Sequence, residues 1–155
     1  MSPAAYSKNQ VRKAGEYLRD FLAGRSGGGT GDVRAEELAR ALRVVNWWRE
    51  QHVAPLGGTS AELSYYIGEL GLEQVVTQRL QRVMSIADKL HRYPEMKLDR
   101  MEDIAGVRAI LPTQSDVDAL VLKLHRHPGW RNRGVRGYVR AGSPVRSRMA
   151  IAAST

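Results

Sequence analysis

The sequence predicts an α+β protein in which a helical region comes first and strands and helices then alternate around a small mixed sheet. Three observations support this prediction. Apolar residues recur at helical spacing through the first half of the chain. Two shorter apolar runs in the second half, residues 74–78 and 103–111, have the composition and the flanking residues of strands. Helical patterns separate and follow these runs, so we expect helices on one face of the sheet.

The first expected helix lies within residues 1–24. Ser7 and Gln10 form a capping-box pattern at its start, and Gly24 is a typical stop. Residues 25–32 are rich in glycine and read as a flexible linker. Because an isolated helix of this length is marginal in water, we expect it to pack on the core of the chain or on a second subunit.

Two more helices are expected before the first strand. Asp32 can cap a long helix over residues 33–52, whose apolar side chains keep helical spacing. The segment APLGGTS at 54–60 predicts a break, because proline and glycine end helices. A further helix is then expected over residues 60–70.

The strands and helices of the second half follow in alternation. Residues 74–78 predict a strand, residues 82–93 predict a helix, and residues 103–111 predict a second strand. Each of the last two is closed by a proline, at Pro94 and Pro112.

The end of the chain predicts one more helix and one more strand. Ser115 and Asp118 resemble a capping box for the helix, and residues 133–139 read as the strand. These elements complete an expected core over residues 33–140. The basic tail, 141–155, has no useful periodicity, and we expect it to be irregular.

Composition limits the class of protein. The 155 residues are 43% hydrophobic, which is enough for a core. The absence of cysteine excludes disulfides and thiolate metal sites, and with no membrane-length apolar run or signal-peptide pattern it fits a cytoplasmic protein without a membrane partner. The net charge of +8, with no acid after Asp118, favours phosphate-bearing partners such as nucleotides or RNA, or an acidic protein.

The strand at 103–111 carries charges that a core strand does not need. Val107 and Ala109 fall on one strand face and Arg108 on the other, while Asp103 stands at the mouth of the strand. An unpaired buried charge costs several kcal/mol, about 2–7 even for a neutral polar group, so we expect a charged group to dock on the Arg108 face.

The preceding helix offers a matching set of groups. Arg82, Ser85 and Lys89 share one face, at i, i+3 and i+7, while another face is apolar. Together with Arg79, these groups suit a polyphosphate, and Asp103 suits the magnesium ion that a polyphosphate carries. The alternative is a solvated helix face and a turn aspartate, and spacing alone does not decide between them.

These residues resemble a known family. Residues 78–111, QRLQRVMSIADKLHRYPEMKLDRMEDIAGVRAIL, look like the synthetase domain of the RelA/SpoT homologues, the alarmone synthetases. The segment VVNWWREQHVAPL at 44–56 also resembles the first long helix of the small synthetases, and the likeness covers about 41–138. The positions that match the family motif, in order, are Arg79, Gln81, Ser85, Ile86, Lys89, Asp103, Ile104 and Arg108.

The resemblance implies a nucleotidyltransferase-like fold and a pyrophosphate transfer. The family moves pyrophosphate from ATP to the 3′-hydroxyl of GDP or GTP with magnesium, giving (p)ppGpp, and some toxin-like members use the 3′ end of tRNA. By motif match, Arg79, Ser85 and Lys89 would bind ATP phosphates. Asp103 would hold Mg²⁺ as the catalytic carboxylate of an active member, and Arg108 would support the site.

Two departures from the family pattern change the expected activity. Gln81 stands where the family usually has lysine, and after Tyr138 neither the Gly-Tyr-Arg-x-x-His acceptor segment nor a glutamate occurs. Read one nucleotide out of register, residues 148–155 can encode Asp-Gly-Tyr-Arg-x-Val-His with permitted codons. We therefore expect a homologue truncated at the C-terminus by a frameshift.

The expected function is to bind a ligand with the part of a synthetase active site that remains, the part for ATP and magnesium. A truncated synthetase that keeps much of its ATP and magnesium half would be catalytically impaired and would bind a nucleotide or a protein partner, in a regulatory or toxin–antitoxin-like pair. The first alternative is an active pyrophosphokinase that completes its acceptor site from a second subunit or uses another acceptor. The second is a basic RNA-binding module. A homo-oligomer is compatible with each.

Overall fold

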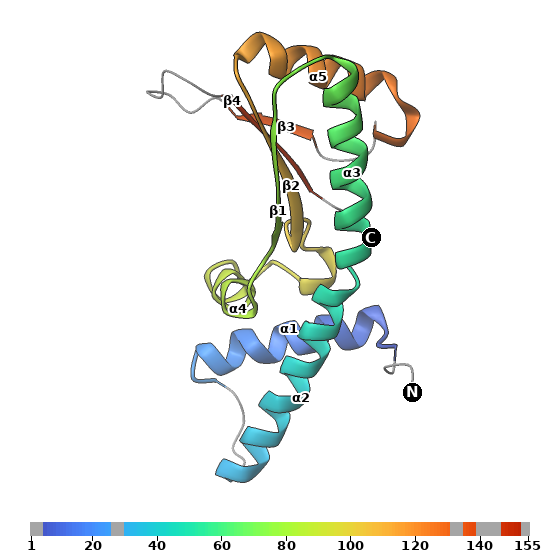
Figure 1. The fold of residues 1–155 in the computed structure, drawn as a ribbon. Coiled ribbons are helices and arrows are strands. Elements are labelled where there is room, and N and C mark those ends of the chain that lie inside the picture. The colour runs from blue at the N-terminus through green and yellow to red at the C-terminus, as the bar shows by residue number, and fades with distance from the viewer. Residues whose placement is uncertain (1–4, 26–29, 131–134, 139–146, 153–155) are drawn as a thin grey trace. The chain divides into compact units, whose positions relative to one another are not determined.

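The computed structural model of the chain describes residues 5–25, 30–130, 135–138 and 147–152 (Figure 1). Within these residues the protein is a mixed α+β structure, which confirms the expected class. The elements are α1 (Lys8–Leu22), α2 (Gly31–Glu50), α3 (Val53–Glu69), β1 (Val75–Leu80), α4 (Val83–Arg92), the 3-10 turn η1 (Leu98–Arg100), β2 (Ala105–Leu111), α5 (Gln114–Arg126), the 3-10 turn η2 (Pro128–Trp130), β3 (Val135–Tyr138) and β4 (Ser147–Ala152).

The chain divides into two compact units, and neither is continuous in sequence. The first unit comprises Met1–Gln51 and Gln81–Met101, and so contains α1, α2, α4 and η1. The second comprises His52–Leu80 and Glu102–Thr155, and so contains α3, α5 and the sheet. The core expected over residues 33–140 is therefore shared between both units.

The first helix packs within the first unit. Of the two arrangements expected for it, packing on its own chain or on a second subunit, the structure shows the first. α1 contacts α2, α4 and η1, and buries Val11 and Leu18. Its start has the expected capping box: the Gln10 backbone N–H donates to Ser7 Oγ at 3.2 Å, and the Ser7 backbone N–H donates to Gln10 Oε1 at 2.8 Å. Gly24 follows the helix at φ +67°, the left-handed conformation that a helix stop uses.

The break expected at residues 54–60 is wrong. α3 begins at Val53 and continues through this segment. Pro55 is the third residue of the helix, in the first turn, where a backbone N–H has no intrahelical acceptor to lose. Gly57 and Gly58 keep a negative φ and cost only about 1 kcal/mol each relative to alanine, which the rest of the helix offsets.

The sheet contains four strands in the order β1-β2-β4-β3, and all three pairings are antiparallel. The strands expected in the second half are present, but the expected mixed sheet is wrong for the described residues. The chain leaves the sheet after Leu80, at the end of β1, and returns to it at Ala105, at the start of β2. These two residues pair with each other. The chain therefore re-enters beside the end that it left, which makes the pair antiparallel.

β4 corrects the prediction that the tail is irregular. It pairs with both β2 and β3. Its six residues are too few for a clear periodic signal, and its partner β2 lies more than 30 residues away in the sequence. Tertiary pairing therefore decides its structure.

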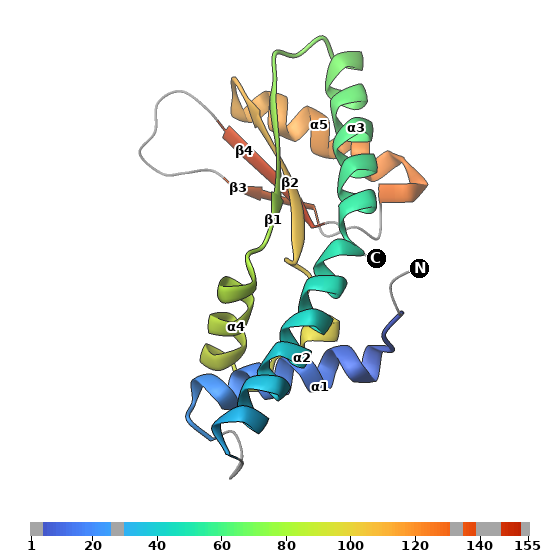
Figure 2. The same cartoon turned by 60° about the horizontal axis from the view of Figure 1, so that its bottom comes forward.

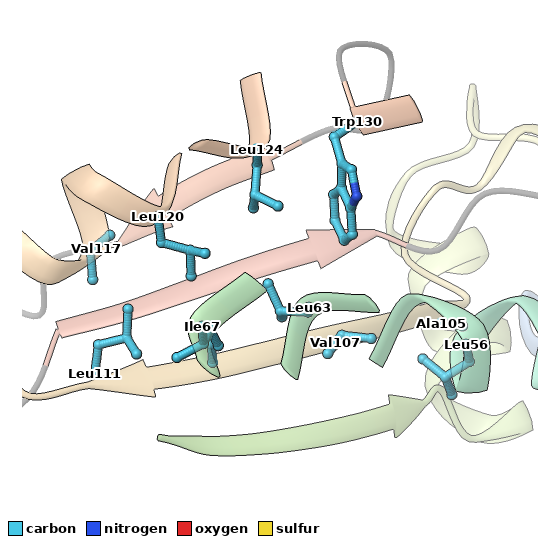
Figure 3. Packing of buried hydrophobic residues seen from close by; sticks show 11 residues of the cluster. Leu56, Leu63, Ile67, Ala105, Val107, Leu111, Val117, Leu120, Leu124 and Trp130 are labelled. Atoms are coloured by element: carbon cyan, nitrogen blue, oxygen red, sulfur yellow. The ribbon is translucent and has the colours of Figure 1, made fainter. Parts of the chain in front are cut away.

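The core of the second unit lies on one face of the sheet (Figure 3). Ala105, Val107, Ala109 and Leu111 alternate with more exposed residues along β2 and face the helices. The helices α3 and α5 lie on this side of the sheet in both views (Figures 1 and 2). The buried side chains that they and η2 contribute are Leu56, Leu63, Ile67, Val117, Leu120, Leu124 and Trp130.

The start of α5 is capped differently from the prediction. The Asp116 backbone N–H donates to Thr113 Oγ1 at 3.2 Å, and the Thr113 backbone N–H donates to Asp116 Oδ2 at 3.0 Å. The capping box is thus Thr113 with Asp116, and not Ser115 with Asp118. Both pairs have the same spacing, so the sequence pattern alone does not separate them.

Candidate functional site

Two of the expected phosphate-binding residues, Arg79 and Arg108, lie on the β1–β2 pair in the second unit. They are on the sheet face opposite the buried core, here called the open face. Thr77 is opposite Arg108 and Arg79 is opposite Gly106, so the two arginines are diagonal neighbours. Such residues share one face of an antiparallel pair, about 7–8 Å apart. Both arginines are exposed, whereas Val107 and Ala109 are buried. The prediction that Arg108 faces away from the core is confirmed.

Asp103 is an exposed carboxylate two residues before β2, also in the second unit. The described residues contain no group of three or more histidine, aspartate or glutamate side chains that could enclose a metal ion. Magnesium bound to a polyphosphate commonly takes one or two carboxylates and fills its other positions with phosphate oxygens and water. A single exposed aspartate fits that mode of binding, in which Asp103 would share the ion with the phosphates.

The other expected residues lie on α4, in the first unit. The buried side of this helix carries Ile86 and Leu90, which confirms the expected apolar face. Ser85 and Lys89 are half-buried, and Arg82 is the exposed N-cap residue. The first turn contains no acidic residue and no side-chain cap, so its backbone N–H groups keep the positive end of the helix dipole.

Gln81 differs from its neighbours in the motif because its side chain is only 7% exposed. Its Oε1 atom is buried without a hydrogen-bond partner. Its backbone carbonyl oxygen accepts a hydrogen bond from Arg49 Nε at 2.6 Å, which ties the end of α2 to the residue before the α4 cap. The sequence gives no sign of this role for Arg49, because a side chain that binds a backbone carbonyl needs no particular partner residue.

The expected site residues therefore divide between the two units. Gln81, Arg82, Ser85 and Lys89 belong to the first unit, and Arg79, Asp103 and Arg108 belong to the second. Within the first, α4 holds a cation, a hydroxyl and a second cation along one helix. Within the second, the β1–β2 register holds two guanidinium groups on one face.

A separate polar group joins α3 to α5 on the covered side of the sheet. Lys123 Nζ lies 3.0 Å from Glu69 Oε2, and Tyr65 Oη donates to Glu69 Oε1 at 3.1 Å. Lys123 also lies 5.9 Å from the centre of the Tyr66 ring. The hydrogen bond from Lys123 lowers the pKa of Glu69, and the bond to Glu69 raises the pKa of Tyr65. Lys123 thus links α5 to α3 near the surface, beside the buried apolar contacts between the two helices.

Among the described residues, every helix is too short or too polar to cross a bilayer. No protein-family model matches the chain, and no significant match is found among curated proteins.

Proposed function

We propose that this chain is a RelA/SpoT-type homologue that binds a magnesium–nucleoside triphosphate, with ATP as the first candidate. One observation carries the proposal. An arginine, a Ser-Ile pair, a lysine, an Asp-Ile pair and a further arginine follow one another between Arg79 and Arg108 in the order of the family motif. The arginines, the serine and the lysine can bind phosphate, and the aspartate can bind magnesium.

The local geometry supports this assignment within each unit. Arg79 and Arg108 present guanidinium groups on an exposed sheet face, and guanidinium groups bind phosphate through paired hydrogen bonds. Ser85 and Lys89 lie one helical turn apart on α4, so a hydroxyl and an ammonium group are neighbours on one side of the helix. Asp103 would hold the magnesium ion.

We also propose that these 155 residues bind the nucleotide without transferring pyrophosphate. Such a transfer depends on holding both substrates in line and on stabilising the developing charge. The sequence contains no glutamate after Glu102 to orient or deprotonate an acceptor hydroxyl. The arginines that follow are not bases, because their pKa lies above about 12. The role of the bound nucleotide would be regulatory.

Titration calorimetry with ATP, with and without magnesium, tests the binding. Lys89→Ala should weaken binding about tenfold or more, since a hydrogen bond to a charged group contributes about 1.5–3 kcal/mol. Asp103→Asn should weaken binding and reduce its dependence on magnesium. Lys97→Ala and Asp118→Asn remove the same charges from exposed positions and should bind like the wild type. Wild-type affinity in both site variants would contradict the proposal.

Nucleotide chromatography tests the absence of transfer. After incubation with ATP, magnesium and GDP or GTP, we expect the nucleotides to be unchanged. Formation of a 3′-pyrophosphorylated product would refute this second part and would favour the active alternative, in which a second subunit or another group completes the acceptor site.

A further inference from the structure

Gln81 lies between two elements of secondary structure and belongs to neither. The paired register of β1 ends at Leu80, and α4 follows its N-cap residue Arg82. The first hydrogen bond of the helix uses the Arg82 carbonyl oxygen, which accepts from the Ile86 backbone N–H at 3.0 Å. The carbonyl oxygen of Gln81 is therefore outside both regular patterns and needs a partner of its own.

Arg49, in the last turn of α2, supplies this partner. Its Nε atom donates to the Gln81 carbonyl oxygen at 2.6 Å, and its Nη1 atom donates to Asn46 Oδ1 at 3.0 Å. Asn46 thus holds the guanidinium group from within α2, while the same group holds the chain just before α4. All three residues belong to the first unit. An ammonium group would not fix two partners in this way, because only the planar guanidinium presents its N–H groups in a rigid arrangement.

The start of α4 has no side-chain cap of its own. Its N-cap residue, Arg82, makes no capping hydrogen bond, and the first turn contains no acidic residue. The Gln81 side chain does not replace the cap, because its Oε1 atom is buried without a hydrogen-bond partner. An uncapped helix start is prone to fray, since its first backbone N–H groups have no intrahelical acceptor. The bond from Arg49 therefore fixes the chain at the point where α4 needs support.

We infer that Arg49 is a positioning residue for the phosphate-binding side chains of α4. The inference rests on the proposed function, in which Ser85 and Lys89 bind the phosphates of the nucleotide. Arg49 acts without touching the nucleotide. By holding the chain before the helix, it keeps the first turn of α4 ordered before the ligand arrives. A group that is already ordered binds more tightly, because less conformational freedom is lost on binding.

Titration calorimetry of the full chain with ATP and magnesium, below the melting temperature of every variant, gives the first measurement. Arg49→Gln should weaken ATP binding about threefold to tenfold, which is comparable with the net contribution of one hydrogen bond. Arg49→Lys keeps the charge and should recover only part of the affinity. Arg43→Gln removes the same charge from an exposed position of the same helix and should bind like the wild type.

A double-mutant cycle separates positioning from a direct contact and from a loss of folded protein. If Arg49 acts mainly through Lys89, Arg49→Gln should weaken ATP binding only about twofold or less in a Lys89→Ala background, because the positioned group is already absent. A phosphate contact made by Arg49 itself, or partial unfolding, would weaken binding by the same factor in both backgrounds.

Hydrogen exchange without nucleotide gives a measurement that does not depend on the ligand. The Ile86 amide should exchange faster in Arg49→Gln than in the wild type, whereas amides in the middle of α5, in the second unit, should keep their rates. Asn46→Ala leaves Arg49 in place but removes the group that orients it. This variant should show the same change to a smaller extent, and it provides the test if Arg49→Gln fails to fold.

The results that overturn the inference differ from those that refute the proposed function. If the wild type binds no ATP, the proposed function is wrong and the role of Arg49 in it is wrong as well. If the wild type binds ATP and Arg49→Gln binds it equally well, only the positioning role is wrong. Full recovery in Arg49→Lys, or an equal loss in Arg43→Gln, would assign the effect to charge alone. Unchanged exchange at Ile86 in both Arg49→Gln and Asn46→Ala would show that α4 does not depend on Arg49.

Discussion

Replacing Gly15 with alanine tests the close approach of α1 to η1 in the first unit. A Cβ atom at this position of α1 would lie 2.7 Å from Leu98 Cβ and 3.3 Å from Leu90 Cδ1. Leu98 and Leu90 are buried, and the Cβ of Leu98 cannot move without its backbone. Either α1 or η1 must therefore shift, and overpacking of this kind costs about 1–3 kcal/mol.

The helix propensity of alanine acts in the opposite direction and requires a matched control. Gly→Ala inside a helix contributes about 1 kcal/mol of stability where the new methyl group meets no neighbour. Gly58 in α3 is such a position, because nothing lies within 4 Å of a Cβ built there. We expect Gly15→Ala to be less stable than Gly58→Ala, each relative to wild type, by about 1–3 kcal/mol.

Urea unfolding followed by circular dichroism gives the two free energies, and hydrogen exchange of the α1 amides shows whether the change is local to the first unit. Faster exchange in α1 should accompany Gly15→Ala and be absent from Gly58→Ala. If the two variants are equally stable and exchange in α1 is unchanged, α1 does not pack on η1 as described.

Two further variants test the second unit. Thr113→Ala should lower the free energy of unfolding by about 1 kcal/mol because α5 loses its N-cap, while Ser115→Ala should change it little; equal urea midpoints for both would contradict the capping assignment. Glu69→Gln should make stability less sensitive to acid. Lys123 lowers the pKa of Glu69, so the stabilisation is present above the ordinary value of 4.5 and is lost as pH falls through the lowered folded-state pKa. Melting temperatures measured from neutral to acid pH should therefore converge for Glu69→Gln and wild type at the acid end, and parallel curves would disprove the contribution.

Elements with strong local signals could be predicted from the sequence. The capping box of Ser7 and Gln10 identifies the start of α1, and the two-faced pattern of α4 identifies its buried side. The alternation around Arg108 identifies the core face of β2. In each case the determining contacts lie within a few residues along the chain, so periodicity and capping chemistry are sufficient.

The errors arise where tertiary structure overrides a local signal. Pro55 and two nearby glycines have the composition of a turn, yet the first turn of a helix tolerates proline. β4 depends on partners more than 30 residues away along β2, where Arg148 pairs with Ile110. The sequence pattern assigned the candidate site residues to the correct strands and helix. It could not indicate that these residues divide between two compact units.

The nested connectivity of the two units has a consequence for folding during synthesis. The chain passes from one unit to the other after Gln51, after Leu80 and after Met101. α1 therefore emerges from the ribosome long before α4 and η1, the elements that cover it. The apolar side of α1 stays incompletely covered for about 4–16 seconds, because the 78 residues from Ala23 to Arg100 must be added at about 5–20 residues per second. The first unit has all of its residues once Met101 has been added, whereas the second still lacks α5, β3 and β4, which follow β2 in the chain, so the two units are completed at different times.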